Sequence, residues 1–146
     1  MYRRLDLQMD RVSPEKRSQM MSRVRSKDTV PELIVRRMVY GMGYRYRLHV
    51  KQLPGKPDLV FRKARRVIFV HSCFFHQHSC GAGTIPKTHT PFWRTKLRNN
   101  VKRDAGNVLA LNQSGWRVLT VWQCELKDRA ELESRLRKFL NGANKQ

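Results

Sequence analysis

Two strongly apolar segments separated by a long amphipathic stretch restrict the fold of this chain more than any other feature. RRVIFVH (65 to 71) and WRVLTVW (116 to 122) have the length and the branched or aromatic residues of buried strands. The stretch from 91 to 115 carries apolar residues in a helical rhythm at Trp93, Leu97, Val101, Val108 and Leu111. A strand, a helix and a second strand form a crossover, so the two strands should lie parallel and side by side.

Shorter strand patterns precede this unit. YRYRLHV (44 to 50) alternates in polarity, PGK (54 to 56) is typical of a turn, and PDLVF (57 to 61) leads into the strand at 65 to 71. Segments joined so closely pair antiparallel. Together with the parallel pair they predict a mixed central sheet, and therefore an α/β fold with helices against the sheet.

Three further helices are predicted around this sheet. Residues 13 to 26 begin with Ser-Pro and are rich in Arg and Met, which makes their basic face a candidate DNA contact. Residues 29 to 43 start at TVPE, which has the spacing of a capping box, and end in a glycine-rich turn. Residues 131 to 140 form an amphipathic helix that closes the fold.

We expect a single domain over residues 13 to 141, between a flexible N-terminal arm (1 to 12) and a disordered tail (142 to 146), since 146 residues suit one core. The first residues lack the apolar centre of a signal peptide, and no apolar run reaches about 18 residues, so we expect a soluble cytoplasmic protein without a membrane partner. Three cysteines, two of them within a histidine cluster, fit metal ligation in a reducing compartment better than disulfides.

The charge of the chain indicates a polyanionic partner. Thirty-one Lys and Arg against eleven Asp and Glu give a net charge of +20. Residues 30 to 103 carry sixteen Lys and Arg but only two carboxylates, Glu32 and Asp58. A carboxylate on a surface that faces phosphates lowers affinity by repulsion, so these two acids need a reason to be there.

Each of the two acids has two explanations. Asp58 follows Pro57 at the start of a strand, where it can accept turn hydrogen bonds, and Glu32 can complete its capping box. Together they also suggest a site for a hard cation, because Mg²⁺ takes oxygen ligands from one or two carboxylates and substrate phosphate. The strand at 65 to 71 lies beside Asp58 in the predicted sheet and could add a backbone carbonyl. The residues alone leave both explanations open.

The segment HSCFFHQHSC (71 to 80) predicts a structural zinc site. Such sites usually take four thiolate and imidazole ligands, and Cys73, Cys80 and Cys124 together with one histidine make four. Cys73 and Cys124 each follow the end of one of the two parallel strands by two residues, which places them at the same edge of the sheet. Without this co-location Cys124 would be read as a thiol of the core.

Spacing does not decide whether His76 or His78 is the fourth ligand. In either case His71 and the remaining histidine lie at the rim of a metal-bound loop, where they are either available for proton transfer or ordinary solvent-facing residues. The aromatic pairs Phe74-Phe75 and Phe92-Trp93 also have two interpretations. They belong to the core, or they lie on loops beside a basic face and wedge between base pairs.

The chain resembles the very short patch repair (Vsr) DNA mismatch endonucleases. The resemblance covers about Ser13 to Lys127 and rests on five motifs in order. They are RSQMMSRVRSKDTVPE (17 to 32), LPGKPDLVF (53 to 61), VIFVHSCFFHQHSC (67 to 80), FWRTKLRNNVKRD (92 to 104) and GWRVLTVWQCEL (115 to 126).

What the resemblance implies is an enzyme with a restriction-endonuclease-like fold of the PD-(D/E)xK type, in which helices flank a mixed central sheet. It would use Mg²⁺ to nick one strand of duplex DNA on the 5′ side of the thymine in a T:G mismatch that arises from deamination of 5-methylcytosine. Its partners would be double-stranded DNA with such a mismatch and other mismatch-repair proteins. It would act as a monomer in the cytoplasm, associated with the nucleoid when bound to DNA.

The resemblance also implies roles for individual residues. Asp58 would bind Mg²⁺ together with the main-chain carbonyl of Val70. His76 would be the catalytic histidine that handles the attacking water, His71 would support the scissile phosphate, and Glu32 would belong to the surrounding shell.

Two more sets of residues match the family by position. Structural zinc would be bound by Cys73, His78, Cys80 and Cys124. Intercalation beside the mismatch would use Phe74, Phe75 and Trp93.

The sequence departs from the family pattern at a few positions. Val70 stands where threonine is common, Phe75 replaces a common tryptophan, and Gln77 and Ser79 replace histidines. These changes affect the expected sequence context of the target more than the chemistry. Two other functions fit the residues: a restriction-type endonuclease that cuts matched sites, and a zinc-stapled DNA-binding module without catalysis.

Overall fold

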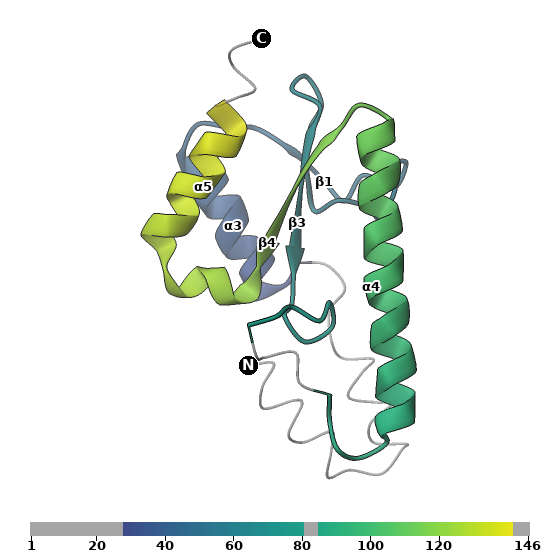
Figure 1. The fold of residues 1–146 in the computed structure, drawn as a ribbon. Coiled ribbons are helices and arrows are strands. Elements are labelled where there is room, and N and C mark those ends of the chain that lie inside the picture. Colours follow the sequence, from purple (N-terminus) through teal and green to yellow (C-terminus); the bar gives the residue numbers. More distant parts are fainter. Residues whose placement is uncertain (1–27, 81–84, 142–146) are drawn as a thin grey trace.

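The computed structural model of the chain describes residues 28–80 and 85–141. Within them, four strands form one sheet in the order β1-β2-β3-β4 (Figure 1). Their bounds are Arg47–Leu48 for β1, Leu59–Phe61 for β2, Arg66–His71 for β3 and Arg117–Trp122 for β4. The predicted arm at 1 to 12, helix at 13 to 26 and tail at 142 to 146 lie outside the described residues.

The pairing of the strands confirms the predicted mixed α/β sheet. β3 and β4 are parallel, with a register that runs from Arg66 opposite Arg117 to His71 opposite Trp122. The connection between them is the helix α4 (Thr90–Gln113), as the crossover predicted. β1 pairs with β2, and β2 with β3, antiparallel.

The first strand is shorter than the alternation at 44 to 50 predicted. Only Arg47 and Leu48 pair with β2. His49 then leaves the extended conformation, with a φ of 48°, and this left-handed geometry ends the ladder because an extended strand needs negative φ.

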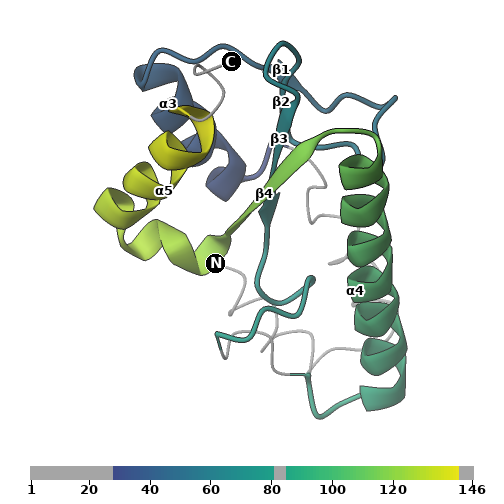
Figure 2. The ribbon, with the colours of Figure 1, turned by 45° about the horizontal axis from the view of Figure 1, so that its top comes forward.

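Helices cover both faces of the sheet. In Figures 1 and 2, α4 lies on one side, while α3 (Val30–Gly41) and α5 (Arg129–Asn141) lie on the other. The larger core joins α3 and α5 to the sheet through Val35, Val39, Leu59, Phe61, Ile68, Val121, Leu132, Leu136 and Leu140. The smaller core lies under α4 and contains Val60, Val67, Phe69 and Leu111. Neighbouring strand residues alternate between the two cores, as the two-residue period of a strand requires.

One helix was not predicted, and one prediction at the start of α3 is wrong in part. A 3₁₀ helix, η1 (Gln123–Lys127), follows β4 and carries Cys124. At the start of α3 the Thr29 hydroxyl accepts the Glu32 N–H at 3.3 Å, but the predicted capping box is wrong in its second half. The Glu32 side chain is directed instead to Arg36 and His49, because burial requires it to find charged partners.

No helix among residues 28–80 and 85–141 combines the length and apolarity that crossing a membrane requires.

Candidate active site and metal-binding cluster

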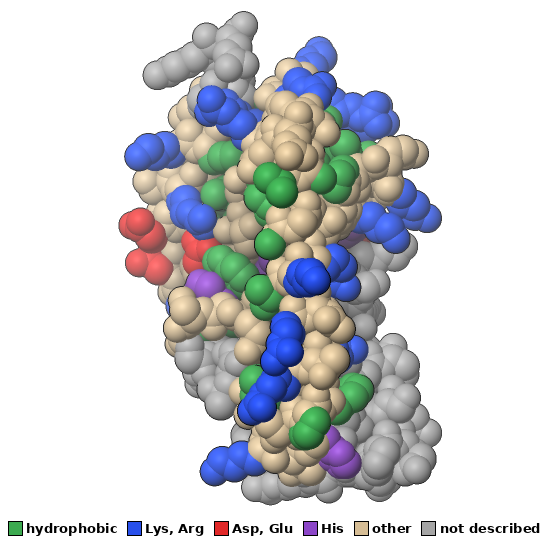
Figure 3. All heavy atoms as spheres, turned by 45° about the vertical axis from the view of Figure 1, so that its right-hand side comes forward, with side chains coloured by type: hydrophobic (Ala, Val, Ile, Leu, Met, Phe, Trp, Pro, Cys, Tyr) green, Lys and Arg blue, Asp and Glu red, His purple; other side chains and the backbone are tan. Residues whose placement is uncertain are grey.

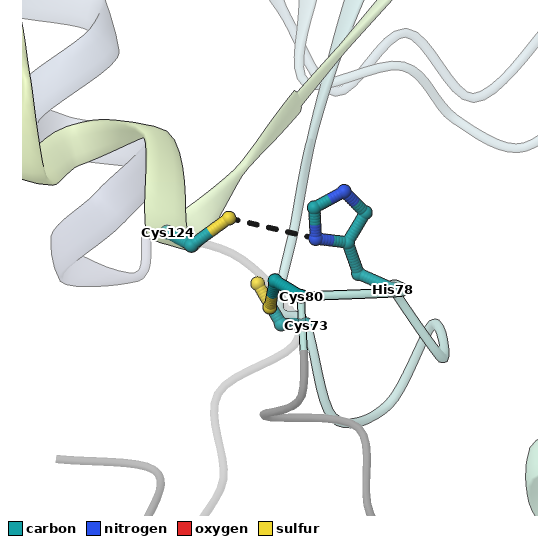
Figure 4. Close-up of side chains that lie close together, drawn as sticks. All are labelled: Cys73, His78, Cys80 and Cys124. Atoms are coloured by element: carbon teal, nitrogen blue, oxygen red, sulfur yellow. Dashed lines mark hydrogen bonds between the residues drawn. The ribbon is translucent and has the colours of Figure 1, made fainter.

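Four metal-ligand side chains meet at the end of the parallel strand pair. Donor atoms of Cys73, His78, Cys80 and Cys124 all lie within 4.8 Å of one another, and the Cys124 Sγ is 3.5 Å from His78 Nδ1 (Figure 4). His71 and Trp122 end their strands in register, so the cysteines two residues beyond each arrive at one place. The predicted convergence of Cys73 and Cys124 is confirmed.

The structure groups His78, and not His76, with the thiols. The His78 ring also stacks on Trp122, with centroids 4.3 Å apart and planes at 16°. This support from β4 fixes the imidazole next to Cys124. Three thiols and one imidazole form a donor set typical of structural zinc, and four protein ligands leave no open position for a reacting water.

Without a metal, burial keeps thiols of the cluster protonated. Burial raises the pKa of Cys73 to about 12 and raises the pKa of Cys124 above its ordinary value. A dication bound here would displace the thiol protons and compensate the charge of the thiolates. The cluster could therefore bind a metal such as zinc.

Replacing Cys124 with serine is expected to abolish stoichiometric zinc binding and to destabilise the loop at 72 to 80. A hydroxyl is a poor zinc ligand, and a structural zinc site contributes directly to folding free energy. Zinc content by atomic absorption and amide hydrogen exchange across the loop measure both effects. His89→Asn removes a histidine outside the cluster and should keep one zinc per chain. A Cys124→Ser protein that retains the zinc and the protection of the loop would show that Cys124 is no ligand.

A cavity of about 760 Å³ opens beside the cluster. One wall is the connection between β1 and β2, and the floor is formed by Asp58, just before β2, and by the end of β3. The other wall is α4. The two walls meet where Gly55, with a φ of 77°, approaches Asn107. A Cβ at Gly55 would lie 2.8 Å from the Asn107 amide nitrogen, so this close contact requires glycine.

Asp58 lies on the floor of this cavity with its side chain 14% exposed. Its Oδ2 accepts the Val70 N–H at 2.7 Å, which confirms that Asp58, the residue before β2, lies beside Val70 of β3. Burial raises the pKa of Asp58 to about 7, and the nearby Glu32 carboxylate adds to the shift. Within residues 28–80 and 85–141, no lysine or arginine pairs with this carboxyl group. A hard cation would therefore compensate its charge, and the carboxylate fits such a ligand.

The raised pKa makes the stability of the protein depend on pH. The folded state holds the Asp58 proton up to about pH 7, whereas the unfolded chain releases it near 3.8, so this contribution to stability is present at low pH and lost as pH rises through 7. An Asp58→Asn protein has no such loss. Between pH 5.5 and 8, in buffer without divalent cations, its unfolding free energy should gain about 2 kcal/mol on wild type. Urea denaturation measures this difference, and parallel pH curves for the two proteins would contradict it.

Two histidines and an aspartate form a second group in the cavity. His76 Nδ1 lies 2.5 Å from Asp104 Oδ2, and the His76 ring stacks on His71 with centroids 3.7 Å apart. When Nδ1–H donates to the carboxylate, Nε2 keeps its lone pair and can accept a proton. Burial, with the adjacent His76 as the next cause, lowers the pKa of His71 to about 3. His71 is thus neutral and acts as a hydrogen-bond donor or acceptor without charge.

The loop that carries His76 is held against α4. Asn100 donates to the Phe75 carbonyl at 3.0 Å, and Asp104, one turn further along the helix, holds His76. The Ser72 hydroxyl accepts the Phe75 N–H at 3.1 Å. These contacts and the cysteine cluster fix both ends of the loop, so its imidazole is directed into the cavity.

Glu32 lies behind Asp58 and not beside it. Its side chain is 2% exposed, and its Oε1 lies 2.6 Å from Arg36 Nη2 and 2.8 Å from His49 Nε2. His49 in turn faces Asp58, with 3.7 Å between Nδ1 and Oδ1. The two carboxylates that the sequence singled out are therefore connected through an imidazole.

The aromatic side chains separate into buried and exposed ones. Phe74 and Trp93 are 2% and 0% exposed, and they pack edge to face at 5.3 Å in a core with Leu97. Phe75 is partly buried against this core, whereas Phe92 is 51% exposed. Of the two interpretations that the sequence left open, burial in a core describes Phe74 and Trp93 in this structure. Their intercalation stays a prediction that would require this core to open.

The surface around the cavity is basic. Figure 3 shows Lys and Arg over the face formed by α4, with acidic side chains confined to one edge of the view. Lys51, Lys56 and Arg103 line the cavity and are exposed. Phosphate groups would be attracted to this face and to the opening above Asp58.

The sequence did not single out Asp104 or His49. Asp104 lies just beyond the acid-poor stretch, and twenty-eight residues separate it from His76. Its helical spacing to Asn100 and Asn107 was a signal that it shares a face with them. His49 looked like a strand residue, and only its left-handed backbone directs it into the site.

Comparison with known proteins identifies the family of the chain. A model of the family described as DNA mismatch endonuclease Vsr matches residues 9–82. The type II nicking enzyme V.XorIIP of Xanthomonas oryzae pv. oryzae is 51% identical over 132 residues, which cover 90% of this chain and 97% of the relative. The type II nicking enzyme V.NmeAIP of Neisseria meningitidis is 42% identical, over 90% of this chain and 94% of the relative. The DNA mismatch endonuclease Vsr of Escherichia coli is 40% identical, over 80% of this chain and 74% of the relative.

These matches combine a family model over half of the chain with relatives that align over most of their length. They favour a nicking enzyme over the alternative of a DNA-binding module without catalysis. The chain belongs to the Vsr family and is a DNA nicking endonuclease.

Proposed function

We propose that the enzyme nicks duplex DNA on the 5′ side of the thymine in a T:G mismatch left by deamination of 5-methylcytosine, and leaves 3′-hydroxyl and 5′-phosphate ends. The observation that carries this proposal is the cavity in which Asp58 and the His76–Asp104 pair face one opening in a basic surface. A cation ligand and a proton acceptor at the same phosphate are what hydrolysis of a phosphodiester needs. The 40% identity to the E. coli DNA mismatch endonuclease supports a mismatch as the target.

Asp58 and Val70 are the proposed ligands of Mg²⁺, through a carboxylate oxygen and a main-chain carbonyl. The Val70 N–H holds Oδ2 and so orients the carboxylate toward the cavity. When bound, Mg²⁺ would polarise the scissile phosphate and stabilise its developing charge. Lys51, Lys56 and Arg103 draw the phosphate chain to this position.

His76 is the proposed general base. Asp104 fixes the tautomer with the proton on Nδ1, so Nε2 can take a proton from water. His71 lies against the His76 ring and, being neutral, supports the phosphate through a hydrogen bond and not through charge. The cluster of Cys73, His78, Cys80 and Cys124 is proposed to bind structural zinc and to position this loop without taking part in the chemistry.

Recognition of the mismatch is proposed to use aromatic side chains next to the loop. Phe75 is partly exposed in this structure, and Phe74 and Trp93 would follow only if DNA opened their core. The enzyme is proposed to act as a monomer, since a T:G pair is asymmetric, and to work with other mismatch-repair proteins.

Single-turnover nicking of a pair of otherwise identical duplexes tests the proposed function. They differ only in one base pair, T:G in one and C:G in the other, and both carry end labels on each strand. With Mg²⁺ we expect one cut, 5′ to the mismatched thymine, in the T:G duplex alone, and no cut without divalent cations. Equal cutting of both duplexes would reject mismatch specificity. Cuts in both strands of the C:G duplex would favour the restriction-type alternative.

A further inference from the structure

We propose that His49 is a positioning residue, which ties the buried Glu32–Arg36 pair to Asp58 and so fixes the carboxylate oxygen offered to a divalent cation. The proposal rests on the cation role that the proposed function gives to Asp58. One imidazole contacts both carboxylates: Nε2 lies 2.8 Å from Glu32 Oε1, and Nδ1 lies 3.7 Å from Asp58 Oδ1. The His49 backbone N–H also donates to the Asp58 carbonyl at 3.4 Å.

The far end of this connection is rigid. Glu32 is buried on α3, and Arg36 one turn later places Nη2 2.6 Å from the Glu32 carboxylate and 2.6 Å from Asp28. The same nitrogen lies 3.0 Å from His49 Nε2. Asp28, Glu32 and His49 have the spacing of a cation site, but the guanidinium already lies where they converge. This group is therefore an anchor for His49 and not a second metal centre.

The near end leaves Asp58 able to bind a cation. Oδ2 is occupied by the Val70 N–H at 2.7 Å. Oδ1 is 3.7 Å from His49 Nδ1, beyond the usual limit of about 3.2 Å for a direct hydrogen bond. The imidazole therefore lies against the carboxylate without consuming the ligand capacity of Oδ1. Both groups line the cavity, so the free side of Oδ1 faces the space where the phosphate is proposed to enter.

The backbone at His49 supports a functional reason for this placement. Its φ of 48° lies in the left-handed region, which is uncommon for residues other than glycine and which Asn, Asp and His adopt more often than the rest. Such a conformation costs on the order of 1–3 kcal/mol and persists where its surroundings require it. Here it ends β1 and directs the ring between the two carboxylates, where a continued strand would not place it.

Three substitutions separate positioning from a structural role. His49→Gly removes the ring and relaxes the backbone, because glycine adopts positive φ freely. His49→Asn keeps a polar atom near the Nδ1 position and tolerates the left-handed conformation, whereas His49→Gln reaches only toward the Nε2 position. For His49→Gly we expect the half-saturating Mg²⁺ concentration for nicking of the T:G duplex to rise about tenfold to hundredfold, as for other partners of metal ligands. The maximal rate at saturating Mg²⁺ and the duplex affinity should stay close to wild type.

A binding readout complements the activity. In a His76→Ala background, which is expected to bind the duplex and cut it only slowly, the Mn²⁺ affinity of the protein–duplex complex is measured by electron paramagnetic resonance. Adding His49→Gly should weaken Mn²⁺ binding by the same factor. His49→Asn should recover most of the Mn²⁺ affinity, whereas His49→Gln should not. An unchanged Mn²⁺ affinity in His49→Gly would overturn the proposal, as would a lower maximal rate at unchanged Mg²⁺ dependence.

Asp58→Asn in the same background separates the cation role of Asp58 from the positioning role of His49. If Asp58→Asn does not weaken Mn²⁺, the cation role of Asp58 fails, and the positioning role fails with it. If Asp58→Asn weakens Mn²⁺ and His49→Gly does not, only the role of His49 fails. Should His49→Gly not fold, the Asn and Gln proteins decide by the same criterion, and equal Mn²⁺ affinity in both would reject the role.

Discussion

Asp58→Asn is expected to lower Mg²⁺-dependent nicking by at least about a thousandfold while duplex affinity stays the same or increases. The amide can still accept the Val70 N–H, so the local fold is kept, but it is a poor ligand for a hard cation. Charge stabilisation by a catalytic metal contributes several kcal/mol to the transition state, and each 1.36 kcal/mol is a factor of ten in rate. Loss of a negative charge next to the phosphate removes a repulsion, which favours binding.

Single-turnover nicking of the T:G duplex and fluorescence anisotropy without divalent cations measure rate and affinity separately. Glu133→Gln is the matched control, because it makes the same change in an exposed carboxylate of α5 that pairs with Arg137. It should nick at the wild-type rate. Wild-type nicking by Asp58→Asn would remove this carboxylate from the chemistry, whatever its effect on stability.

His76→Ala is expected to reduce the nicking rate by about 10²- to 10⁴-fold, the usual contribution of a general base. A loss of the same order is expected for Asp104→Asn, since an amide does not select the tautomer with the proton on Nδ1. Zinc content should be unchanged in both variants, because His78 and not His76 belongs to the cysteine cluster.

Added imidazole provides a further check on His76. A small base that enters the cavity should restore part of the nicking rate of a His76→Gly protein. It should not restore the nicking rate of Asp58→Asn. His89→Asn, a substitution at the start of α4 outside the cavity, is the histidine control and should retain full activity. If His76→Ala loses its zinc together with its activity, the imidazole is a metal ligand and the assignment of the base is wrong.

The topology was readable from the sequence because the two strongest apolar patterns are both strands. RRVIFVH forms the mostly buried β3 and WRVLTVW forms its parallel neighbour β4, and the helical rhythm between them is α4. The prediction that β4 is buried is wrong: it is the edge strand of the sheet, and only Val121 in it is fully buried. The patterns failed where local backbone geometry overrode polarity. The alternation at 44 to 50 continues through His49, but a left-handed φ ends β1 after Leu48.

The site was predictable as far as it depended on strand ends. The parallel pairing of β3 and β4 followed from the crossover, and it brought Cys73 to Cys124. Spacing could not choose between His76 and His78, because that choice depends on Trp122, which stacks on one ring, and on Asp104, which holds the other. Contacts between such distant positions depend on packing and not on local pattern.

The sequence singled out Glu32 and Asp58 together, and whether they share a cation site stays a prediction. Glu32 and Asp58 do lie in one network, but an arginine and a histidine of the basic stretch mediate between them. Counting acids alone could not show this, because Arg36 was counted with the phosphate-binding charges. Because the buried Arg36 guanidinium pairs with Glu32, it contributes little to the attraction of DNA phosphates.

The most direct test of the account is to locate both metals in one crystal of the protein with a T:G duplex and Mn²⁺ in place of Mg²⁺. Anomalous scattering at the zinc and manganese edges identifies each ion. We predict zinc bound by Cys73, His78, Cys80 and Cys124, manganese at Asp58, and His76 bound to neither. Zinc on His76, or manganese away from Asp58, would contradict the account.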